Sequence, residues 1–401
     1  MKMNQALSNR INNLSESQTL EMARLSRELK EQGHDVISLS LGEPDFNIPE
    51  FIKDAAKQAI DENYSSYTPV NGYANLRKAI SHKFKRDNDL YYSSEQIVVS
   101  TGAKQSIANV LMCLINPGDE VLLPVPYWVS YEAMTQLSEG KTTAIKTNIE
   151  NDFKITAEQL EKSITTRSKV LLFSSPCNPS GSVYTKNELK AIAEVIVKHK
   201  NLYVISDEIY EHIVFDGKHE SIASFDFIYD RVITINGLSK AFAMTGWRLG
   251  YLGAPLWIAK ACTKMQGQIT SGTNCIAQRA AIAALEADPK RIAYMQKSFL
   301  ARRNLLINQL KGINGIKLNN PAGAFYLFID ISSYFGKKTT DGHTIKNASD
   351  LCMFILNECH VALVTGEAFG DPNCIRISYA ASENNISEAT KRIKESLLKL
   401  Y

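Results

Sequence analysis

The sequence predicts an α/β protein with a large domain built on a mainly parallel sheet, covered by helices on both faces, and a smaller α+β domain. Between residues 96 and 234, short apolar runs rich in β-branched residues alternate with turns and with segments of helical spacing. Parallel strands need crossover connections, which are usually helices, so this repetition indicates a parallel sheet. Near the C-terminal end the pattern changes to short strands separated by loops and one helix. We therefore assign residues 49–300 to the large domain, and residues 1–48 together with 301–401 to the small domain.

Three helices and one strand are expected before the sheet begins. Apolar residues at helical spacing predict a helix from Leu20 to Gly33, and residues 35–41 form a short expected strand. Pro49 suits the first turn of a helix that runs to about residue 61, and another helix extends over residues 74–86. The loop over residues 64–73 carries three tyrosines and is therefore too aromatic for a plain linker.

The expected strands of the large sheet share an apolar, β-branched core that ends in polar or small residues. They are residues 97–100, 120–123, 169–173, 202–206 and 231–235, with helices over about 103–115 and 186–199. Helices over 256–265 and 275–309 follow, and Asp288-Pro289 is expected to break the second one. The small domain then contributes strands at 324–330, 361–364 and 374–378.

The composition is that of an ordinary globular protein. The chain has 401 residues and a formal net charge of +3, so it gives no reason to expect nucleic acid or an anionic membrane as a partner. No apolar run reaches the ~18 residues of a membrane span, and the polar N-terminus lacks the apolar stretch of a secretion signal. The seven cysteines show no C-x-x-C spacing, so we expect no metal site, no disulfide framework and a cytoplasmic location.

The loop after the strand at 231–235 presents Lys240, with Arg248 eight positions later and then Gly250. A lysine held in a desolvated, positively charged pocket loses its proton more readily and becomes a nucleophile for carbonyl groups. Pyridoxal phosphate is the cofactor that uses such a lysine, and Arg248 would suit its phosphate. The alternative is a solvated Lys240 and an Arg248 that pairs with a surface carboxylate.

Other polar residues follow other strands, at the carboxyl edge where open α/β sheets bind ligands. Gly102-Ala103-Lys104 opens a helix whose backbone N–H groups suit a phosphate, although a strand–turn–helix joint often needs a glycine anyway. Asp207 ends an apolar strand, where its carboxylate either meets a cation such as a protonated pyridine nitrogen or caps the following turn.

Aromatic, amide and guanidinium side chains complete this group of candidates. Trp128 and Tyr210 offer a stacking face and a hydroxyl, or else belong to the core. Asn178 lies between prolines that restrict its loop, so its amide is aimed at a ligand or simply occupies a turn. Arg376 lies within an apolar strand, where an inward guanidinium needs an anion such as a substrate carboxylate, whereas on an edge strand it would face water.

In their order along the chain, these residues resemble those of class I pyridoxal-phosphate-dependent aminotransferases of fold type I, nearest the bacterial aspartate aminotransferase branch. The matching stretches are Ser40-Leu-Gly42-Glu-Pro-Asp-Phe46, Tyr67-Thr-Pro, Gly102-Ala-Lys-Gln105, Pro126-Tyr-Trp-Val-Ser-Tyr131, Ser175-Pro-Cys-Asn-Pro-Ser-Gly181, Ser206-Asp-Glu-Ile-Tyr-Glu-His212, Asn236–Gly250 and Arg376-Ile-Ser-Tyr-Ala380. They cover nearly the whole chain. One difference is Gly102-Ala103, where relatives often have two glycines, but the alanine still offers its N–H.

The resemblance implies a role for each of these residues. Lys240 is expected to hold the cofactor covalently and to move the proton of the substrate. The other implied cofactor contacts are Asp207 with the pyridine nitrogen, Asn178 and Tyr210 with the phenolic oxygen, Trp128 on the ring, and Ala103, Lys104, Ser239 and Arg248 with the phosphate, joined by Tyr67 from the other subunit of a homodimer. The implied substrate contacts are Gly42, Trp128, Asn178 and Arg376.

The implied reaction is ping-pong transamination from aspartate or glutamate to a 2-oxo acid such as 2-oxoglutarate. Lys104 and Thr19 are the candidates for binding the second carboxylate of such a donor. An aromatic amino acid or prephenate aminotransferase is the alternative within the same chemistry, and a carbon–sulfur lyase would share the cofactor and Lys240. A non-catalytic regulator would need a DNA-binding segment, for which we expect this chain to leave no room.

Overall fold

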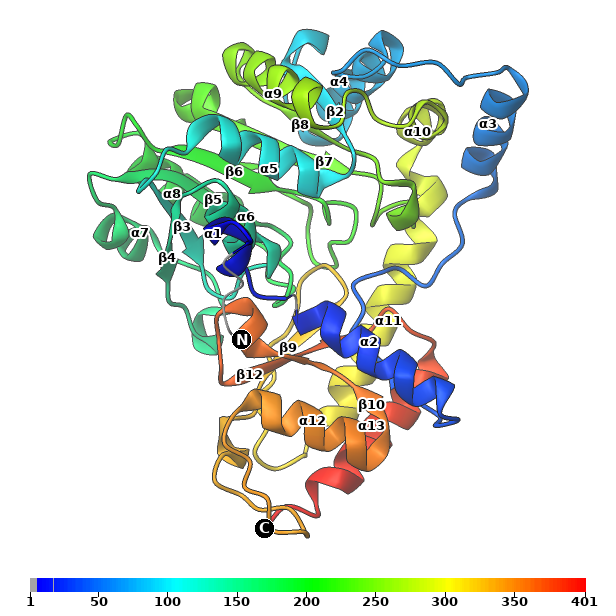
Figure 1. Ribbon diagram of the computed structural model, residues 1–401, viewed down its shortest axis with the longest axis vertical. Coiled ribbons are helices and arrows are strands. Elements are labelled where there is room, and N and C mark those ends of the chain that lie inside the picture. The colour runs from blue at the N-terminus through cyan, green and yellow to red at the C-terminus, as the bar shows by residue number, and fades with distance from the viewer. Residues whose placement is uncertain (1–5, 17) are drawn as a thin grey trace.

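The computed structural model of the protein describes residues 6–16 and 18–401. Its largest sheet has seven strands in the order β2-β8-β7-β6-β5-β3-β4 (Figure 1). Neighbouring strands are parallel except at β8, which runs antiparallel to both β2 and β7. The strands are β2 Ile97–Ser100, β3 Glu120–Pro124, β4 Lys141–Ile145, β5 Ser168–Ser174, β6 Tyr203–Asp207, β7 Val232–Gly237 and β8 Gly250–Gly253. The mainly parallel sheet expected from the sequence is confirmed.

Helices cover both faces of this sheet, and side chains of each strand alternate between them. In β2, Ile97 and Val99 pack into the core on one face, and Val98 packs on the other. The first face is covered by α3 (Glu50–Asp61), α4 (Ala74–Asn88), α7 (Ala157–Ser163), α8 (Lys186–Ile196) and α10 (Cys275–Glu286). The second face is covered by α5 (Ala103–Leu114), α6 (Ser130–Leu137) and α9 (Leu256–Ile269). Nearly every residue of β5, β6 and β7 is buried, which explains their almost continuous apolar sequences.

A smaller group of elements packs around the antiparallel sheet β11-β12-β9 at the other end of the molecule (Figure 1). Its strands are β9 Tyr326–Asp330, β11 Val364–Thr365 and β12 Cys374–Ser378, with β12 in the centre. A short parallel pair joins β1 (Ile37–Ser38) to β10 (Val361–Ala362), so the N-terminal segment packs with the C-terminal part of the chain. The surrounding helices are α2 (Gln18–Glu31), α11 (Ala293–Leu310), α12 (Ala348–Cys359) and α13 (Glu383–Leu397).

One helix connects these two parts of the molecule, and a second, short helix contacts the large domain. The helix α11 extends from the large sheet into the smaller group (Figure 1), and it continues through residue 300, so the division of the domains at that position stays a prediction. The short helix α1 (Asn9–Asn12) lies against the large domain, where Arg10 is 3.5 Å from Glu139. None of the helices within residues 6–16 and 18–401 combines the length and the apolar character needed to cross a bilayer.

Several elements differ from the sequence-based expectations. The strand expected at residues 35–41 pairs only over Ile37–Ser38, and the strand expected at 361–364 is split into β10 and β11, which belong to different sheets. The sequence patterns also fail to indicate β4, an edge strand with one buried residue, and β8, a four-residue strand with glycine at both ends. The break expected at Asp288-Pro289 is confirmed, because α10 ends at Glu286 and α11 begins at Ala293.

Candidate active site

A cavity of about 550 Å³ lies where the carboxyl ends of the parallel strands meet the smaller antiparallel sheet. Its walls come from the loops after the strands of the large sheet and from residues of β9 and β12. This is the edge at which open α/β sheets bind ligands. The cavity is lined by all of the candidate residues except Tyr67: Thr19, Gly42, Ala103, Lys104, Trp128, Asn178, Asp207, Tyr210, Ser239, Lys240, Arg248 and Arg376.

Lys240 follows the end of β7 and points into this cavity. Its Nζ donates a hydrogen bond of 2.5 Å to the carbonyl oxygen of Gly42 and lies 5.8 Å from the centre of the Tyr210 ring. Burial lowers the pKa of Lys240 from 10.5 to about 8; two nearby arginines lower the pKa further, and two carboxylates oppose them. An amine with such a pKa is partly neutral near pH 7, so it can act as a nucleophile and as a proton acceptor. Lys240 is half-buried and bonded to Gly42 rather than fully solvated, and among the described residues Arg248 donates to the carbonyl oxygen of Thr245 and pairs with no carboxylate, so the alternative interpretation is wrong.

Asp207 ends β6 with its carboxylate buried beneath the cavity, and the residue is only 4% exposed. The hydroxyl of Tyr131 donates to Oδ2 at 2.7 Å, and the backbone N–H of Ile209 donates to Oδ1 at 3.3 Å. Burial raises the pKa of Asp207 to about 6, although both hydrogen bonds lower it. The carboxylate therefore caps the following turn, as one interpretation expected, and it also faces the cavity as an acceptor for a cationic N–H group.

The start of α5 and the loop before β8 form a cradle at one end of the cavity. A Cβ atom on Gly250 would lie 2.2 Å from the backbone nitrogen of Ala103, and one on Gly102 would lie 2.4 Å from Nη2 of Arg248. These two glycines therefore let the loop carrying Arg248 approach the N-terminus of α5. Free backbone N–H groups at a helix start, next to a guanidinium and the side chain of Ser239, make a site for a phosphate group.

Arg376 lies in the central strand of the small antiparallel sheet and is only 2% exposed, so the water-facing edge-strand interpretation is wrong. Its Nη1 donates to Oδ1 of Asn178 at 2.9 Å, and its Nη2 donates to the carbonyl oxygen of Ser40 at 2.6 Å. Its Nε is buried and has no hydrogen-bond partner among the described residues. Burial lowers the pKa of Arg376, so an anion in the cavity would satisfy both the orphaned N–H and the buried charge.

Comparison with known families decides the class of this chain. A family model described as aminotransferase class I and II matches residues 34–393. The chain belongs to this aminotransferase family. It is 47% identical over 397 residues to a bifunctional aspartate aminotransferase and glutamate/aspartate-prephenate aminotransferase of Petunia hybrida, covering 98% of this chain and 83% of that protein. It is 42% identical to an aspartate/prephenate aminotransferase of Cereibacter sphaeroides, with 97% of this chain and 98% of the relative covered.

Solved aminotransferase structures match the whole fold. The aspartate aminotransferase of Rhizobium meliloti superposes with a TM-score of 0.95 at 40% identity, covering 98% of this chain and 99% of that one. The aspartate aminotransferase of Thermus thermophilus with maleate has a TM-score of 0.91 at 36% identity, covering 97% and 99%. The fold is therefore that of the fold type I aminotransferases, and the chain is an enzyme whose cofactor is pyridoxal 5′-phosphate.

The cavity of this aminotransferase fits that cofactor at three separate points. Lys240 supplies an amine of lowered pKa for the aldehyde, and Asp207 supplies a buried carboxylate for a ring N–H. The cradle around Gly102 and Gly250 supplies backbone and guanidinium donors for the phosphate. The amine can bind an aldehyde, the carboxylate can accept a hydrogen bond from a ring N–H, and the cradle can bind a phosphate. Pyridoxal phosphate carries these three groups on one rigid ring.

Two tyrosines of this aminotransferase site were not among the sequence-based candidates. Tyr131 lies in α6, three residues after Trp128, and its ring packs edge-on against that tryptophan at 5.5 Å while its hydroxyl reaches Asp207. Tyr326 lies in β9, and its hydroxyl is 2.7 Å from that of Tyr210. The sequence contains one indication of Tyr131, because this tyrosine lies about one helical turn beyond Trp128. Tyr326 gave no local signal, because its partner is 116 positions away.

Tyr67 is the candidate that the structure does not bring to the cavity. It lies in the loop between α3 and α4, and it is fully exposed, at 100%. Trp128, in contrast, is half-buried in the cavity wall, and Nζ of Lys104 lies 4.9 Å from the centre of its ring. Among the described residues, Tyr67 is the most exposed of the large apolar and aromatic side chains, so its ring is free to contact another surface.

Proposed function

We propose that this enzyme transfers the amino group of aspartate or glutamate to a 2-oxo acid such as 2-oxoglutarate. The observation that carries the proposal is a single cavity that contains the Lys240 amine of lowered pKa, the buried acceptor Asp207 and the Nε of Arg376, which no described residue hydrogen-bonds. Aminotransferases need a cofactor-binding amine and a site for the carboxylate that all amino and oxo acids share. The names of the relatives from Petunia hybrida and Rhizobium meliloti support aspartate as the donor.

The residues that would hold the cofactor are those that the resemblance implied. Lys240 would bind its aldehyde, Asp207 would pair with its ring nitrogen, and Trp128 would cover the ring. The phenolic oxygen would accept from Asn178 and Tyr210, and the phosphate would lie against Ala103, Lys104, Ser239 and Arg248. The bound cofactor supplies an electron sink for the substrate carbon.

Lys240 is also the group that would move the proton of the substrate. With a pKa of about 8, a fraction of its amine is neutral near pH 7, and the neutral amine can accept the proton from the α-carbon and then return it. Arg376 would hold the α-carboxylate through Nε and one Nη, and Asn178 and the carbonyl of Ser40 keep the guanidinium in place. Gly42, whose carbonyl oxygen accepts from Lys240, would contact the same substrate.

Lys104 and Thr19 are the proposed site for the second carboxylate of the donor. Both line the cavity, and Lys104 lies beside the indole of Trp128. Burial, with help from Arg248, lowers the pKa of Lys104, so an incoming carboxylate would meet a partly desolvated cation. Prephenate is a second candidate substrate, as the acceptor of the amino group, because several relatives are named aspartate/prephenate aminotransferases. The side chains of Leu20, Leu41 and Val129 also add apolar surface to the same cavity.

The test is to add L-aspartate, and in a parallel sample L-phenylalanine, to the purified enzyme loaded with pyridoxal phosphate. Loss of the visible absorption of the bound cofactor, together with one equivalent of oxaloacetate, is the expected result with aspartate. Lys104→Ala should raise the KM for aspartate much more than that for phenylalanine, whereas equal effects would remove Lys104 from dicarboxylate binding. Pyruvate and ammonia formed from cystathionine, without transamination, would instead indicate the carbon–sulfur lyase.

We also propose that the enzyme is a homodimer in which Tyr67 reaches the phosphate in the partner's cavity. The full exposure of Tyr67 in the single chain supports this arrangement. Sedimentation should give twice the mass of the 44.7 kDa chain. Tyr67→Phe should weaken cofactor binding while the mass stays that of a dimer, and a monomeric mass for the parent enzyme would contradict the proposal.

A further inference from the structure

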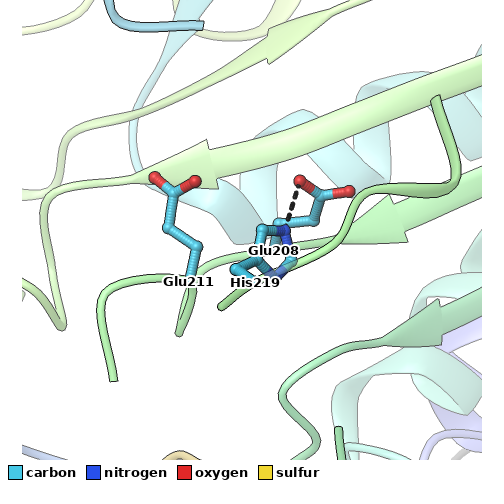
Figure 2. Close-up of side chains that lie close together, drawn as sticks. All are labelled: Glu208, Glu211 and His219. Carbon is cyan, nitrogen blue, oxygen red and sulfur yellow. Dashed lines mark hydrogen bonds and ion pairs between the residues drawn. The ribbon is translucent and has the colours of Figure 1, made fainter. Parts of the chain in front are cut away.

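The turn after β6 carries four side chains that divide into two pairs with different surroundings. Asp207 and Tyr210 line the cofactor cavity, whereas Glu208 and Glu211 do not. The two glutamates are nevertheless buried, with 0% and 7% of each residue exposed. Figure 2 shows them on the side of the turn where His219 lies. Buried carboxylates are costly unless they are paired, so their partners indicate what holds the turn.

Both carboxylate oxygens of Glu208 accept hydrogen bonds from buried or nearly buried donors. Oε1 accepts from the hydroxyls of Ser206 at 2.9 Å and Ser221 at 2.6 Å. Oε2 accepts from Nε2 of His219 at 2.9 Å, the contact drawn in Figure 2. Burial alone would lower the pKa of His219, but the charge and hydrogen bond of Glu208 raise it above its usual value. Glu208 is thus anchored both to β6 itself and to the segment before the next short helix.

Glu211 is held by a separate set of partners, mostly on α4. Its Oε1 forms an ion pair with the ammonium of Lys83, which is itself only 1% exposed, and its Oε2 accepts from Nδ2 of Asn88 at 2.8 Å. Lys83 also donates to Oδ1 of Asn88 at 2.8 Å. Burial would raise the pKa of Glu211, but Lys83 and the neighbouring His212 hold it well below its usual value.

The proximity of Glu208, Glu211 and His219 also raises the question of a metal ion. Ligand atoms of the three residues lie within 4.8 Å of one another. However, both oxygens of Glu208 and Oε2 of Glu211 already accept hydrogen bonds, and Oε1 of Glu211 is paired with the Lys83 ammonium, which supplies the cation there. Within residues 6–16 and 18–401, Nδ1 of His219 has no hydrogen-bond partner, and Nε2 is the ring nitrogen bonded to Glu208. The two carboxylates are therefore balanced by groups of the chain itself, without a metal ion.

We propose that the Glu208–His219 pair is a positioning device for the cofactor, which fixes the turn so that the Asp207 carboxylate and the Tyr210 hydroxyl meet the ring. Asp207 precedes Glu208 directly, and Tyr210 is two residues beyond it, so any movement of Glu208 displaces both. Backbone hydrogen bonds hold the rest of the turn. The N–H of Glu208 donates to the carbonyl oxygen of Ile235, and the N–H of Glu211 donates to the carbonyl oxygen of Glu208. This inference rests on the proposed function for its kinetic consequences, although cofactor binding tests it independently.

Substrate contacts should not respond to this pair. Arg376 and Lys104 lie on β12 and α5, and neither is among the partners of Glu208 or His219. Loss of the pair should therefore weaken cofactor binding and lower kcat, while the KM for aspartate stays close to that of the parent. A merely structural role would lower thermal stability and leave cofactor affinity and the kcat-to-KM pattern unchanged.

The decisive variants are His219→Leu, which removes the donor to Glu208, and His219→Gln, whose amide nitrogen can replace Nε2. Glu208→Gln keeps the shape of the side chain and serves as a second disruption if His219→Leu does not fold. The control is His199→Leu, because His199 forms a similar pair with Glu161, 3.1 Å away, on the exposed surface of the large domain. Measurements are the dissociation constant of pyridoxal phosphate, the pH dependence of its bound visible spectrum, and kcat and KM for aspartate.

We expect His219→Leu and Glu208→Gln to raise the cofactor dissociation constant by about tenfold and to shift the spectral pH dependence, with the KM for aspartate within about twofold. His219→Gln should recover most of the affinity, and His199→Leu should match the parent. Unchanged affinity and spectrum in both disrupted variants would overturn the proposal, and so would a stoichiometric Zn²⁺ or Mn²⁺ whose removal has the same effect as the mutations. If the parent enzyme binds the cofactor but does not transaminate, the proposed function fails, while the comparison of affinities still decides the positioning role.

Discussion

Replacing Lys240 by methionine should stabilise the cofactor-free protein at neutral pH while abolishing transamination. Burial lowers the pKa of this amine from 10.5 to about 8, so below pH 8 the folded protein holds a charged group that the unfolded chain would hold more easily. Each tenfold change in proton affinity corresponds to about 1.4 kcal/mol, so the cost below pH 8 is about 3 kcal/mol. Methionine has a similar length and carries no charge, so it removes this cost.

The gain is partly offset by the lost hydrogen bond to the carbonyl of Gly42, which contributes about 1 to 1.5 kcal/mol. The free energy of unfolding of Lys240→Met should therefore be about 2 kcal/mol greater than that of the parent at pH 7. Because the folded-state pKa of Lys240 is depressed, the penalty is complete below pH 8 and disappears as the pH rises to 10.5, where both states hold a neutral amine. The difference between variant and parent should shrink, and then reverse, over that pH range.

The assay is urea-induced unfolding of the cofactor-free proteins at several pH values, with equal protein concentration because the proposed dimerisation would affect stability. The control is Lys190→Met on α8, whose lysine is 58% exposed and should change stability by less than about 0.5 kcal/mol at any pH. A Lys240→Met protein that is less stable than the parent at pH 7, or a difference that does not depend on pH, would refute the assignment of a buried, charge-destabilised amine.

Three further substitutions test other parts of the site. Arg376→Lys should raise the KM for the amino donor by about 30- to 150-fold with a smaller effect on kcat, measured by steady-state kinetics, because lysine lacks the planar fork and a charge-assisted hydrogen bond is worth about 2 to 3 kcal/mol. Gly250→Ala should weaken cofactor binding by at least about tenfold in equilibrium dialysis, because its Cβ would lie 2.2 Å from the nitrogen of Ala103. Tyr131→Phe should raise the pKa of Asp207 further and lower cofactor affinity by about three- to tenfold in the same assay, because it removes the 2.7 Å hydrogen bond.

Two of these substitutions have matched controls. Gly267→Ala in α9 places a Cβ at 3.7 Å from the side chain of Val70, an ordinary contact, and should leave cofactor binding unchanged. Tyr127→Phe removes a hydroxyl that donates to Glu132 rather than to Asp207, and should leave affinity within about twofold. A KM within about threefold of the parent for Arg376→Lys would mean that the guanidinium does not bind the donor carboxylate.

The cofactor side of the site was largely predictable because parallel strands end at one edge of a sheet. Lys104, Asp207 and Lys240 lie at or just after the ends of three different strands, and the topology brings them to the same cavity although 103 and 33 positions separate them. Glycine contributed in the same way, since Gly102 and Gly250 allow a close backbone approach that any side chain would block. The physical reason is that the sheet register follows from local apolar patterns that the sequence displays.

Contacts between distant segments were not predictable by that reasoning. The Tyr131–Asp207 and Tyr210–Tyr326 hydrogen bonds join residues 76 and 116 positions apart, and their geometry depends on how α6 and β9 pack. The antiparallel strand β8 was also not predictable, because a four-residue strand with glycine at both ends shows no alternation of apolar and polar residues. The helix α13 is different, because its sequence contains a helical pattern. Its buried apolar residues recur at helical spacing: Ile386, Ala389, Ile393 and Leu397.

The hydrogen bond between Arg376 and the carbonyl of Ser40 joins residues 336 positions apart, and this separation matters during synthesis of the protein. Every residue proposed to touch the ring or phosphate within one subunit has been translated by position 248, whereas the guanidinium that completes the carboxylate site is added 128 codons later. At typical rates of elongation this interval is roughly 6 to 25 seconds. A ribosome that stops within it would release a polypeptide that carries the reactive lysine but has no anchor for an amino acid.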